Sequence, residues 1–187
     1  MTRIAVIDFE TTGISPAMGD RATEVAIVIT EQGRVVDRYQ SLMNAGVRIP
    51  SFITQLTGIT NAMLKDAPAA DTVMREAAAF VGDAPMVAHN ASFDSKFWQD
   101  ELQRAGCDPV HAFACTVLLS RRVYPDAPSH SLGRLTDHLG LPRPEHPAAA
   151  PAAPAEENTA LTTLLEQVEY WRAQNRPDMA MPAVERI

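Results

Sequence analysis

The stretch "AVIDFETTG", residues 5–13, constrains the fold of this chain more than any other part of its sequence. Its apolar residues are typical of a buried strand, yet it carries two acids, Asp8 and Glu10, spaced two residues apart. Residues i and i+2 of a strand point to the same face of a sheet, with Cβ atoms roughly 6–7 Å apart. Two half-buried like charges are unfavourable unless positive charge lies between them. The stretch therefore predicts a divalent cation beside a buried strand.

The hydrophobic pattern of the rest of the chain predicts alternating strands and helices. The expected strands are 3–10, 22–30, 34–39, 85–90 and 111–114, and the expected helices are 71–82, 92–105, 116–123 and 131–139. The tripeptide "EQG", residues 31–33, predicts a hairpin turn, and Asp71 or Thr72 is the expected N-cap of the helix 71–82. This order of elements predicts an α/β layer fold with a mixed sheet.

Residues 142–155 contain five prolines and six alanines, a composition that predicts a loop or an extended linker. An amphipathic helix is expected directly after it, over residues 156–173. We therefore expect one domain over residues 1–175, with a tail over residues 176–187.

Composition excludes some classes of protein. The formal net charge of −7 argues against a protein that coats nucleic acid electrostatically, but metal-binding acids in a nuclease also lower the net charge. The sequence contains no run of about 18 apolar residues, so no membrane-spanning helix is expected. The first residues lead straight into an acid-bearing strand, so no signal peptide is expected. Cys107 and Cys115 lack metal-ligand spacing, so we expect free thiols in a cytoplasmic protein.

A second acid-bearing motif is "HNASFD", residues 89–94, which places Asp94 in the first turn of the next helix. Alone, Asp94 is explained by the helix dipole, whose interaction with a carboxylate is worth about 0.3–1 kcal/mol. Together with "DFETTG", residues 8–13, the motif resembles the first two motifs of the DEDD-type 3′→5′ exonucleases. The sequence is similar to the histidine subgroup, which includes proofreading epsilon subunits of bacterial DNA polymerase III. "LTGIT" (56–60) and the Ser-Leu-x-x-Leu segment at 131–135 extend the resemblance.

The resemblance implies a ribonuclease-H-like fold, with a mixed five-stranded sheet flanked by helices. It also implies four carboxylates that hold two Mg²⁺ or Mn²⁺ ions, which activate a water and stabilise the leaving 3′ oxygen. In this scheme Asp8 would bridge both ions, Glu10 would bind one of them, and Asp94 would hold the other ion directly or indirectly.

The same resemblance implies contacts to the substrate. Thr11, Thr12 and Gly13 match the family's turn against the terminal nucleotide, where a glycine lets the backbone approach the substrate. Asn90 and Phe93 are further candidate substrate contacts, and a core position is the alternative role of Phe93.

The third motif of the histidine subgroup departs from the family pattern in this chain. The family has a general-base histidine, four residues, an aspartate that binds metal, Ala, two residues and Thr-Ala. Thr159-Ala160 matches the last pair, and counting back places Ala155 at the aspartate and Ala150 at the histidine. Neither alanine can perform these roles.

Three interpretations of this departure remain open. In the first, Glu156 or Glu157 binds metal in place of the aspartate, and His146 of the Pro/Ala segment is the base, since a histidine with a pKa near 6.5 can accept a proton from water. In the second, the chain keeps the fold and binds nucleic acid or a partner without cleavage. In the third, the Pro/Ala segment is foreign to the chain around it.

The expected function is a stand-alone, metal-dependent 3′→5′ exonuclease that acts on the 3′ end of single-stranded DNA or RNA. The expected partner is that 3′ end and no membrane, with polymerase association and a homodimer left open. A non-catalytic binding module is the rival from another class. A metal-dependent phosphatase would share the acids, but it does not predict the Gly-Ile-Thr and Asn-x-x-Phe-Asp segments.

Overall fold

The computed structural model describes residues 3–141 of the chain. The predicted loop 142–155, the helix 156–173 and the tail lie outside the described residues, as do His146, Glu156 and Glu157. The chain divides into two compact units, residues 1–116 and residues 117–187, and each is described by itself.

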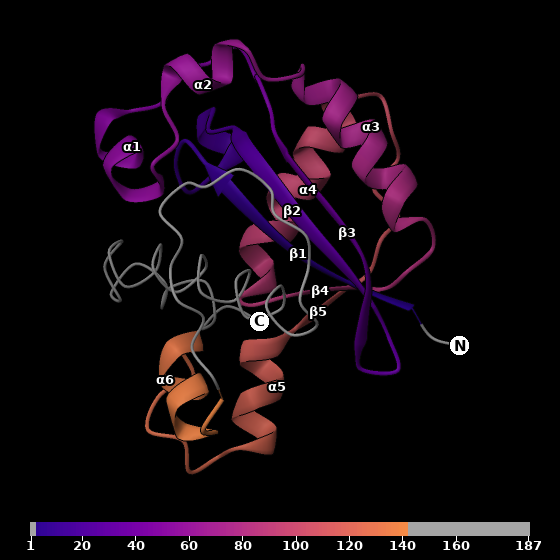
Figure 1. The fold of residues 1–187 in the computed structure, drawn as a ribbon, viewed down its shortest axis with the longest axis vertical. Helices are drawn as coiled ribbons and strands as arrows, with labels where there is room; N and C mark the ends of the chain where they lie inside the picture. Colours follow the sequence, from indigo (N-terminus) through magenta and orange to yellow (C-terminus); the bar gives the residue numbers. More distant parts are fainter. Residues whose placement is uncertain (1–2, 142–187) are drawn as a thin grey trace. The chain divides into compact units, whose positions relative to one another are not determined.

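The first unit is built on a five-stranded sheet in the order β3-β2-β1-β4-β5 (Figure 1). The strands are β1 (Arg3–Thr11), β2 (Ala22–Glu31), β3 (Arg34–Leu42), β4 (Met86–Ala88) and β5 (Phe113–Cys115). β2 is antiparallel to both β1 and β3, whereas β4 is parallel to β1 and β5 is parallel to β4. The mixed five-stranded sheet expected from the sequence is therefore confirmed.

A two-residue turn joins β2 to β3, as the tripeptide "EQG" predicts. Gln32 has φ 52° and Gly33 has φ 76°. Two successive residues with positive φ are the signature of a type I′ turn, whose twist matches that of the flanking strands. The turn fixes the register of the hairpin, in which Glu31 pairs with Arg34.

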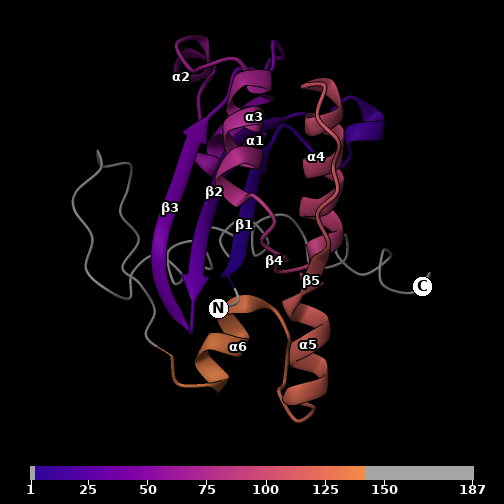
Figure 2. The same cartoon turned by 90° about the vertical axis from the view of Figure 1, so that its right-hand side faces the viewer.

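Two longer helices, α3 (Ala70–Val81) and α4 (Ala91–Arg104), pack on one face of the sheet (Figure 2). A 3₁₀ helix (Pro16–Met18), α1 (Ser51–Thr57) and α2 (Asn61–Lys65) complete the helices described for this unit. The predicted N-cap of α3 is wrong, because the helix begins at Ala70 after the N-cap residue Ala69. Asp71 lies in the first turn instead, where its carboxylate accepts a hydrogen bond from the backbone N–H of Thr72.

One face of β1 packs in the core between the sheet and these helices, and the opposite face carries the polar side chains. Ala5, Ile7 and Phe9 are buried in the core, and the Phe9 ring lies 6.4 Å from the ring of Trp98 on α4. Because side chains alternate along a strand, Asp8 and Glu10 project from the opposite face. The acids thus leave the core without interrupting it.

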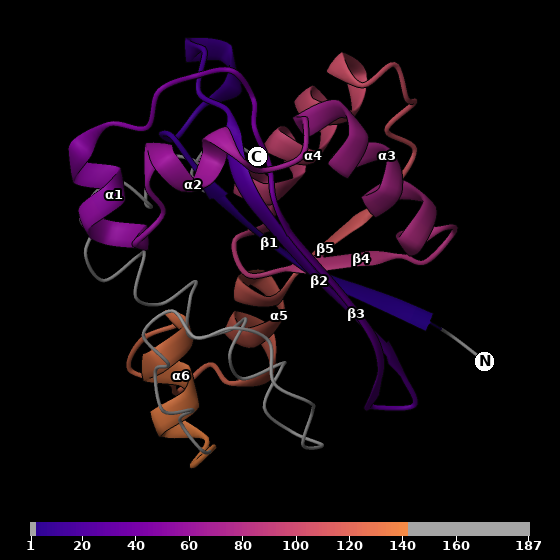
Figure 3. The ribbon, with the colours of Figure 1, turned by 45° about the horizontal axis from the view of Figure 1, so that its top comes forward.

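A second apolar cluster holds α1 and α2 against the sheet. It consists of Ile49, Ile53, Ile59 and Leu64, with Leu42 of β3 packed against it. Both short helices lie beside the carboxyl end of β1, as seen in Figures 1 and 3. This cluster therefore places residues 48–64 at the end of the sheet that carries Glu10.

The described part of the second unit contains two short helices, α5 (Thr116–Val123), whose first residue belongs to the first unit, and α6 (Leu132–His138). Ser120, Leu132 and Leu135 are its buried residues among those described, and Ser120 Oγ lies 3.0 Å from Nδ1 of His130. Both helices agree with the predicted ranges. None of the helices within residues 3–141 has the length and apolar character needed to cross a bilayer.

Candidate active site

Three carboxylates that the sequence singles out are buried near the carboxyl end of β1. Asp8 and Glu10 are each 8% exposed, and Asp94, in the first turn of α4, is 1% exposed. In the ladder with β2, Asp8 pairs with Ala26 and Glu10 pairs with Glu24. Both acids of β1 therefore share one face of the sheet, as the two-residue spacing predicts, and they are held by a strand that is paired on both sides.

A β-bulge follows the second acid directly. Glu10 pairs with Glu24 and Thr11 pairs with Ala22, so Thr23 is the extra residue of β2. The Thr23 hydroxyl is buried and makes no hydrogen bond within residues 3–141. Bulges bend a strand and redirect side chains, and they are common beside active sites. This bulge ends the regular pairing of β1 at the point where the acids leave the sheet.

Glu24 is a fourth acid at this end of the sheet, and it was not among the residues predicted for the site. It lies opposite Glu10 on β2, and its Oε1 accepts a hydrogen bond of 2.7 Å from Nε2 of Gln40. Burial raises the pKa of Glu24, while the hydrogen bond from Gln40 opposes that rise. An acid inside the apolar run "ATEVAIVIT" is the same kind of signal as Asp8 inside β1, so the sequence contained the means to find it.

Negative charge accumulates around Glu10. The pKa of Glu10 is raised to about 8, first by burial and then by the charges of Glu24 and Asp94. Its Oε2 is buried and accepts no hydrogen bond from any residue between 3 and 141. The field of the acids at this end of the sheet therefore favours positive charge beside Glu10.

The donor set suits a hard divalent cation, and it is incomplete within the described residues. Carboxylate oxygens are the ligands that Mg²⁺ and Mn²⁺ prefer, and a dication would offset the burial and the repulsion that together raise the pKa of Glu10. Residues 3–141 contain no group of three or more His, Cys, Asp and Glu side chains arranged to hold a metal ion. That Asp8, Glu10 and Asp94 bind a cation stays a prediction, and the other candidate ligands, Glu156 and Glu157, lie outside the described residues.

We expect the metal-free protein to lose stability as the pH rises from 4.5 to about 8, because the pKa of Glu10 is raised over this interval. A raised carboxyl pKa means that the folded state binds more protons than the unfolded state between these values, so the free energy of unfolding falls with rising pH. Urea unfolding in EDTA at both ends of the interval measures the slope. Glu10→Gln should flatten it, and an equal slope in wild type and variant would contradict the assignment.

The turn 11–13 after β1 is fixed by its own hydrogen bonds. The buried Thr11 hydroxyl donates to the carbonyl of Gly13. Thr12 Oγ1 accepts from the N–H of Arg21 at 3.0 Å, and the Thr12 N–H donates to the carbonyl of Arg21 at 2.9 Å. A Cβ at Gly13 would overlap the carboxylate of Asp20, so a larger residue there would displace that side chain from the N–H of Ser15. Contact of this turn with a nucleotide stays a prediction.

The segment that leads into α4 has an unusual backbone. Asn90, the N-cap residue, has φ 63°, a left-handed conformation that only a few non-glycine residues adopt. Its carbonyl accepts from the N–H of Phe93 at 2.9 Å, and the half-buried Phe93 ring lies 5.0 Å from that of Phe97. His89 directly precedes Asn90 and is buried, and its Nδ1 lies 2.8 Å from the hydroxyl of Thr116. These contacts fix the first turn of α4, which carries Asp94.

A buried ion pair links this helix to the turn beside the acids. Arg21 Nη2 and Glu101 Oε2 lie 2.8 Å apart, and Arg21 Nε donates to Glu101 Oε1 at 2.8 Å. Glu101 Oε1 also accepts from the N–H of Ala22, and Arg21 Nη1 donates to the carbonyl of Ala45. Because the backbone of Arg21 holds Thr12, the pair ties α4 to the end of β1. No local pattern in the sequence predicts this ion pair.

Comparison with known proteins agrees with this architecture. Residues 5–152 match the RNase T family, described as exonuclease. The chain is 39% identical over 140 residues to the 3′-5′ exonuclease DinG of Bacillus subtilis, an alignment that covers 74% of this chain and 15% of DinG. It is 40% identical over 142 residues to a DNA polymerase III subunit epsilon-like protein of Rhodobacter capsulatus, covering 75% of this chain and 20% of that protein. The chain thus spans a fifth or less of the length of these relatives.

Solved structures show the same fold. Exonuclease X in complex with 5′ overhanging duplex DNA superposes with a TM-score of 0.62 at 24% identity, over 96% of this chain and 98% of that one. Apo exonuclease I superposes with a TM-score of 0.69 at 15% identity, over 96% of this chain and 43% of that one. The sheet, the family match and the relatives agree, and the chain belongs to the exonuclease family of the DEDD type.

Proposed function

We propose that the chain is a metal-dependent 3′→5′ exonuclease that removes nucleotides from the 3′ end of single-stranded DNA or RNA. The observation that carries the proposal is the burial of Asp8, Glu10 and Asp94 at one end of an exonuclease-type sheet, with Asp94 close enough to Glu10 to raise its pKa. The 3′-5′ exonuclease named among the relatives supports the direction, and the DNA complex of exonuclease X supports a nucleic-acid substrate.

The candidate metal ligands, the turn 11–13 and the candidate base each have a part in this proposal. Asp8, Glu10 and Asp94 would hold two Mg²⁺ or Mn²⁺ ions, which when bound supply the positive charge that activates water and stabilises the leaving oxygen. The turn 11–13 is rigid, so its backbone would position the terminal nucleotide without rearrangement. His146 would accept the proton from water, and Glu156 or Glu157 would complete the ligand set.

A second candidate function rests on a specific observation in the sequence. Ala150 and Ala155 occupy the positions at which the family has its general base and its fourth carboxylate. A chain that has neither the general base nor the fourth carboxylate would bind the 3′ end of a nucleic acid but would not hydrolyse it. Cleavage by the purified protein separates the two candidates.

The direct test uses 5′-labelled single-stranded oligonucleotides, one DNA and one RNA, with Mg²⁺ or Mn²⁺. A ladder that shortens from the 3′ end, that EDTA abolishes and that a 3′-phosphate delays, is the expected result. Release of the labelled 5′ nucleotide as the first product would refute the direction. Binding of the oligonucleotide by folded protein without any ladder would favour the second candidate.

We further propose that residues 1–175 form the exonuclease domain, with residues 176–187 as a tail, and that the domain works in the cytoplasm. Cys107 and Cys115 are both free, which supports a reducing compartment. Limited proteolysis should remove the tail before it cleaves within residues 1–175, and a stable product that ends before residue 156 would contradict this boundary.

A further inference from the structure

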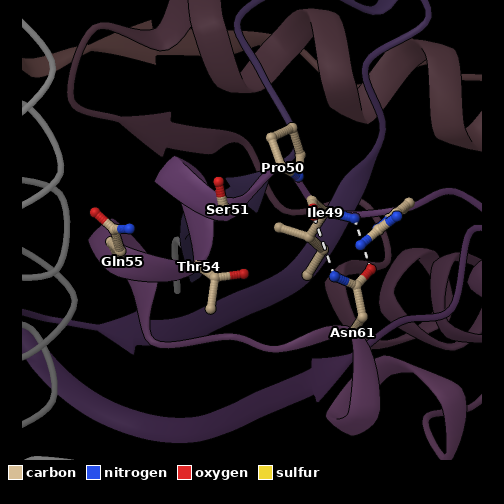
Figure 4. Close-up of a pocket in the computed structure, with 7 residues that line it drawn as sticks. Ile49, Pro50, Ser51, Thr54, Gln55 and Asn61 are labelled. Carbon is tan, nitrogen blue, oxygen red and sulfur yellow. Dashed lines mark hydrogen bonds between the residues drawn. The ribbon is translucent and has the colours of Figure 1, made fainter.

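A pocket of about 740 Å³ lies beside α1, in the first unit and outside the carboxylate cluster (Figure 4). It is lined by Arg48, Ile49, Pro50, Ser51, Thr54, Gln55 and Asn61. Ser51, Thr54 and Gln55 come from α1, whereas Asn61 comes from the start of α2 and faces Ile49 (Figure 4). The proposed active-site chemistry uses none of these residues.

The wall of the pocket is held in place by a pair of hydrogen bonds. Asn61 Oδ1 accepts from the N–H of Ile49 at 2.8 Å, and Asn61 Nδ2 donates to the carbonyl of Ile49 at 3.1 Å. The Ile49 side chain is buried in the apolar cluster that anchors α1 and α2 to β3. The backbone that carries Arg48 is therefore positioned before any ligand arrives, which lowers the entropic penalty of binding.

The chemistry of the lining favours an anion. Arg48 is exposed, and its guanidinium makes no hydrogen bond or ion pair with any residue of the described part of the chain. The lining contains no carboxylate, and Ser51, Thr54 and Gln55 provide neutral hydrogen-bond donors. A guanidinium is well suited to a phosphate group.

The pocket lies at the end of the sheet that carries the acids. Leu42 of β3 packs against the apolar cluster that contains the pocket residue Ile49. Leu42 also pairs with Glu24, which in turn pairs with Glu10. Phe52 follows Ser51 in α1, outside the pocket lining, and it is 59% exposed, whereas the aromatic residues of the main core are buried or half-buried. Phe52 follows Arg48 by four residues in the chain. Single-strand binding proteins combine exposed aromatic rings with cations in this way.

We propose that this pocket binds a phosphodiester of the strand upstream of the 3′ end, with Arg48 on the phosphate and Phe52 stacked on a neighbouring base. The subsite deepens the proposed function and rests on it. Arg48 and Phe52 bind the substrate and take no part in hydrolysis, so they affect long substrates more than short ones.

The test compares the full chain with Arg48→Gln on a single-stranded DNA 12-mer and on a dinucleotide. Loss of one charge-assisted contact should raise KM for the 12-mer about tenfold and leave kcat for the dinucleotide unchanged. The slope of log affinity against log salt should become shallower by about 0.7, because one phosphate contact is lost. Phe52→Leu should raise KM for the 12-mer while leaving the salt slope as it was.

Arg34→Gln is the matched control, because Arg34 is an exposed arginine at the hairpin turn, at the opposite end of the sheet. Equal KM for wild type and Arg48→Gln, or an equal rise in Arg34→Gln, would overturn the subsite. Fluorescence anisotropy with the same 12-mer keeps the two proposals separate. If the protein does not cleave, the nuclease proposal fails, but weaker binding of the 12-mer by Arg48→Gln than by Arg34→Gln still supports the subsite. Equal binding of the 12-mer by wild type and Arg48→Gln overturns the subsite.

Discussion

Replacing Asp8 with asparagine is expected to lower the rate of 3′-end cleavage by about a thousandfold or more. The substitution keeps the shape of a side chain that is 8% exposed and removes its charge. The charge stabilisation that a bound metal ion supplies to a transition state is worth several kcal/mol, and each 1.36 kcal/mol or so corresponds to a factor of ten in rate. Single-turnover cleavage of a 5′-labelled oligonucleotide measures the effect.

Asp37→Asn is the control for this experiment, because Asp37 is an exposed aspartate of β3 and its substitution changes the net charge equally. It should cleave at the wild-type rate. Cleavage by Asp8→Asn within tenfold of wild type would place the chemistry elsewhere on the molecule.

Arg21→Ala is expected to lower the free energy of unfolding by about 3–5 kcal/mol, because it leaves the carboxylate of Glu101 buried without its ion-pair partner. The Glu101 side chain is 1% exposed and that of Arg21 is 15% exposed, so water replaces the lost guanidinium poorly. The variant also frees the link between α4 and the turn 11–13. Urea unfolding followed by circular dichroism measures the loss.

The ion pair of Arg75 with Asp71 on α3 provides the comparison. Both partners are about half exposed and lie one helical turn apart. Exposed pairs of this kind contribute about 0.3–0.5 kcal/mol. Arg75 Nη1 also donates to the carbonyl of Ala105 at 2.7 Å, a bond worth about 0.5–1.5 kcal/mol, so Arg75→Ala should cost no more than about 2 kcal/mol. A loss in Arg21→Ala no larger than that in Arg75→Ala would show that the buried pair does not stabilise the fold.

Local patterns in the sequence were sufficient to predict the strands, the longer helices and the shared face of Asp8 and Glu10. The two-residue period of a strand predicts directly that Asp8 and Glu10 share a face. The "EQG" segment predicts the hairpin turn, whose two residues with positive φ are Gln32 and Gly33. The family match then agrees with the resemblance that the motifs at residues 8–13 and 89–94 carry.

Features that depend on distant residues were missed. Arg21 and Glu101 are 80 residues apart in the chain, and no local pattern pairs one arginine with one of many acids. The bulge at Thr23 depends on the register between two strands, which hydrophobic periodicity does not give. Asp71 or Thr72 was expected to cap α3, but the helix starts at Ala70 after the N-cap residue Ala69, so the Asp71 carboxylate lies inside the first turn.

Calorimetric titration of the EDTA-treated full chain with Mn²⁺ tests the central claim most directly, because it does not depend on whether His146 and the residues near Ala155 complete the catalytic machinery. The carboxylate site predicts saturable Mn²⁺ binding by the wild-type protein, and a large loss of affinity in both Asp8→Asn and Glu10→Gln, with Asp37→Asn unchanged. Absence of binding by the folded wild-type protein, or equal binding by Asp8→Asn, would contradict the assignment of Asp8, Glu10 and Asp94 as the metal site.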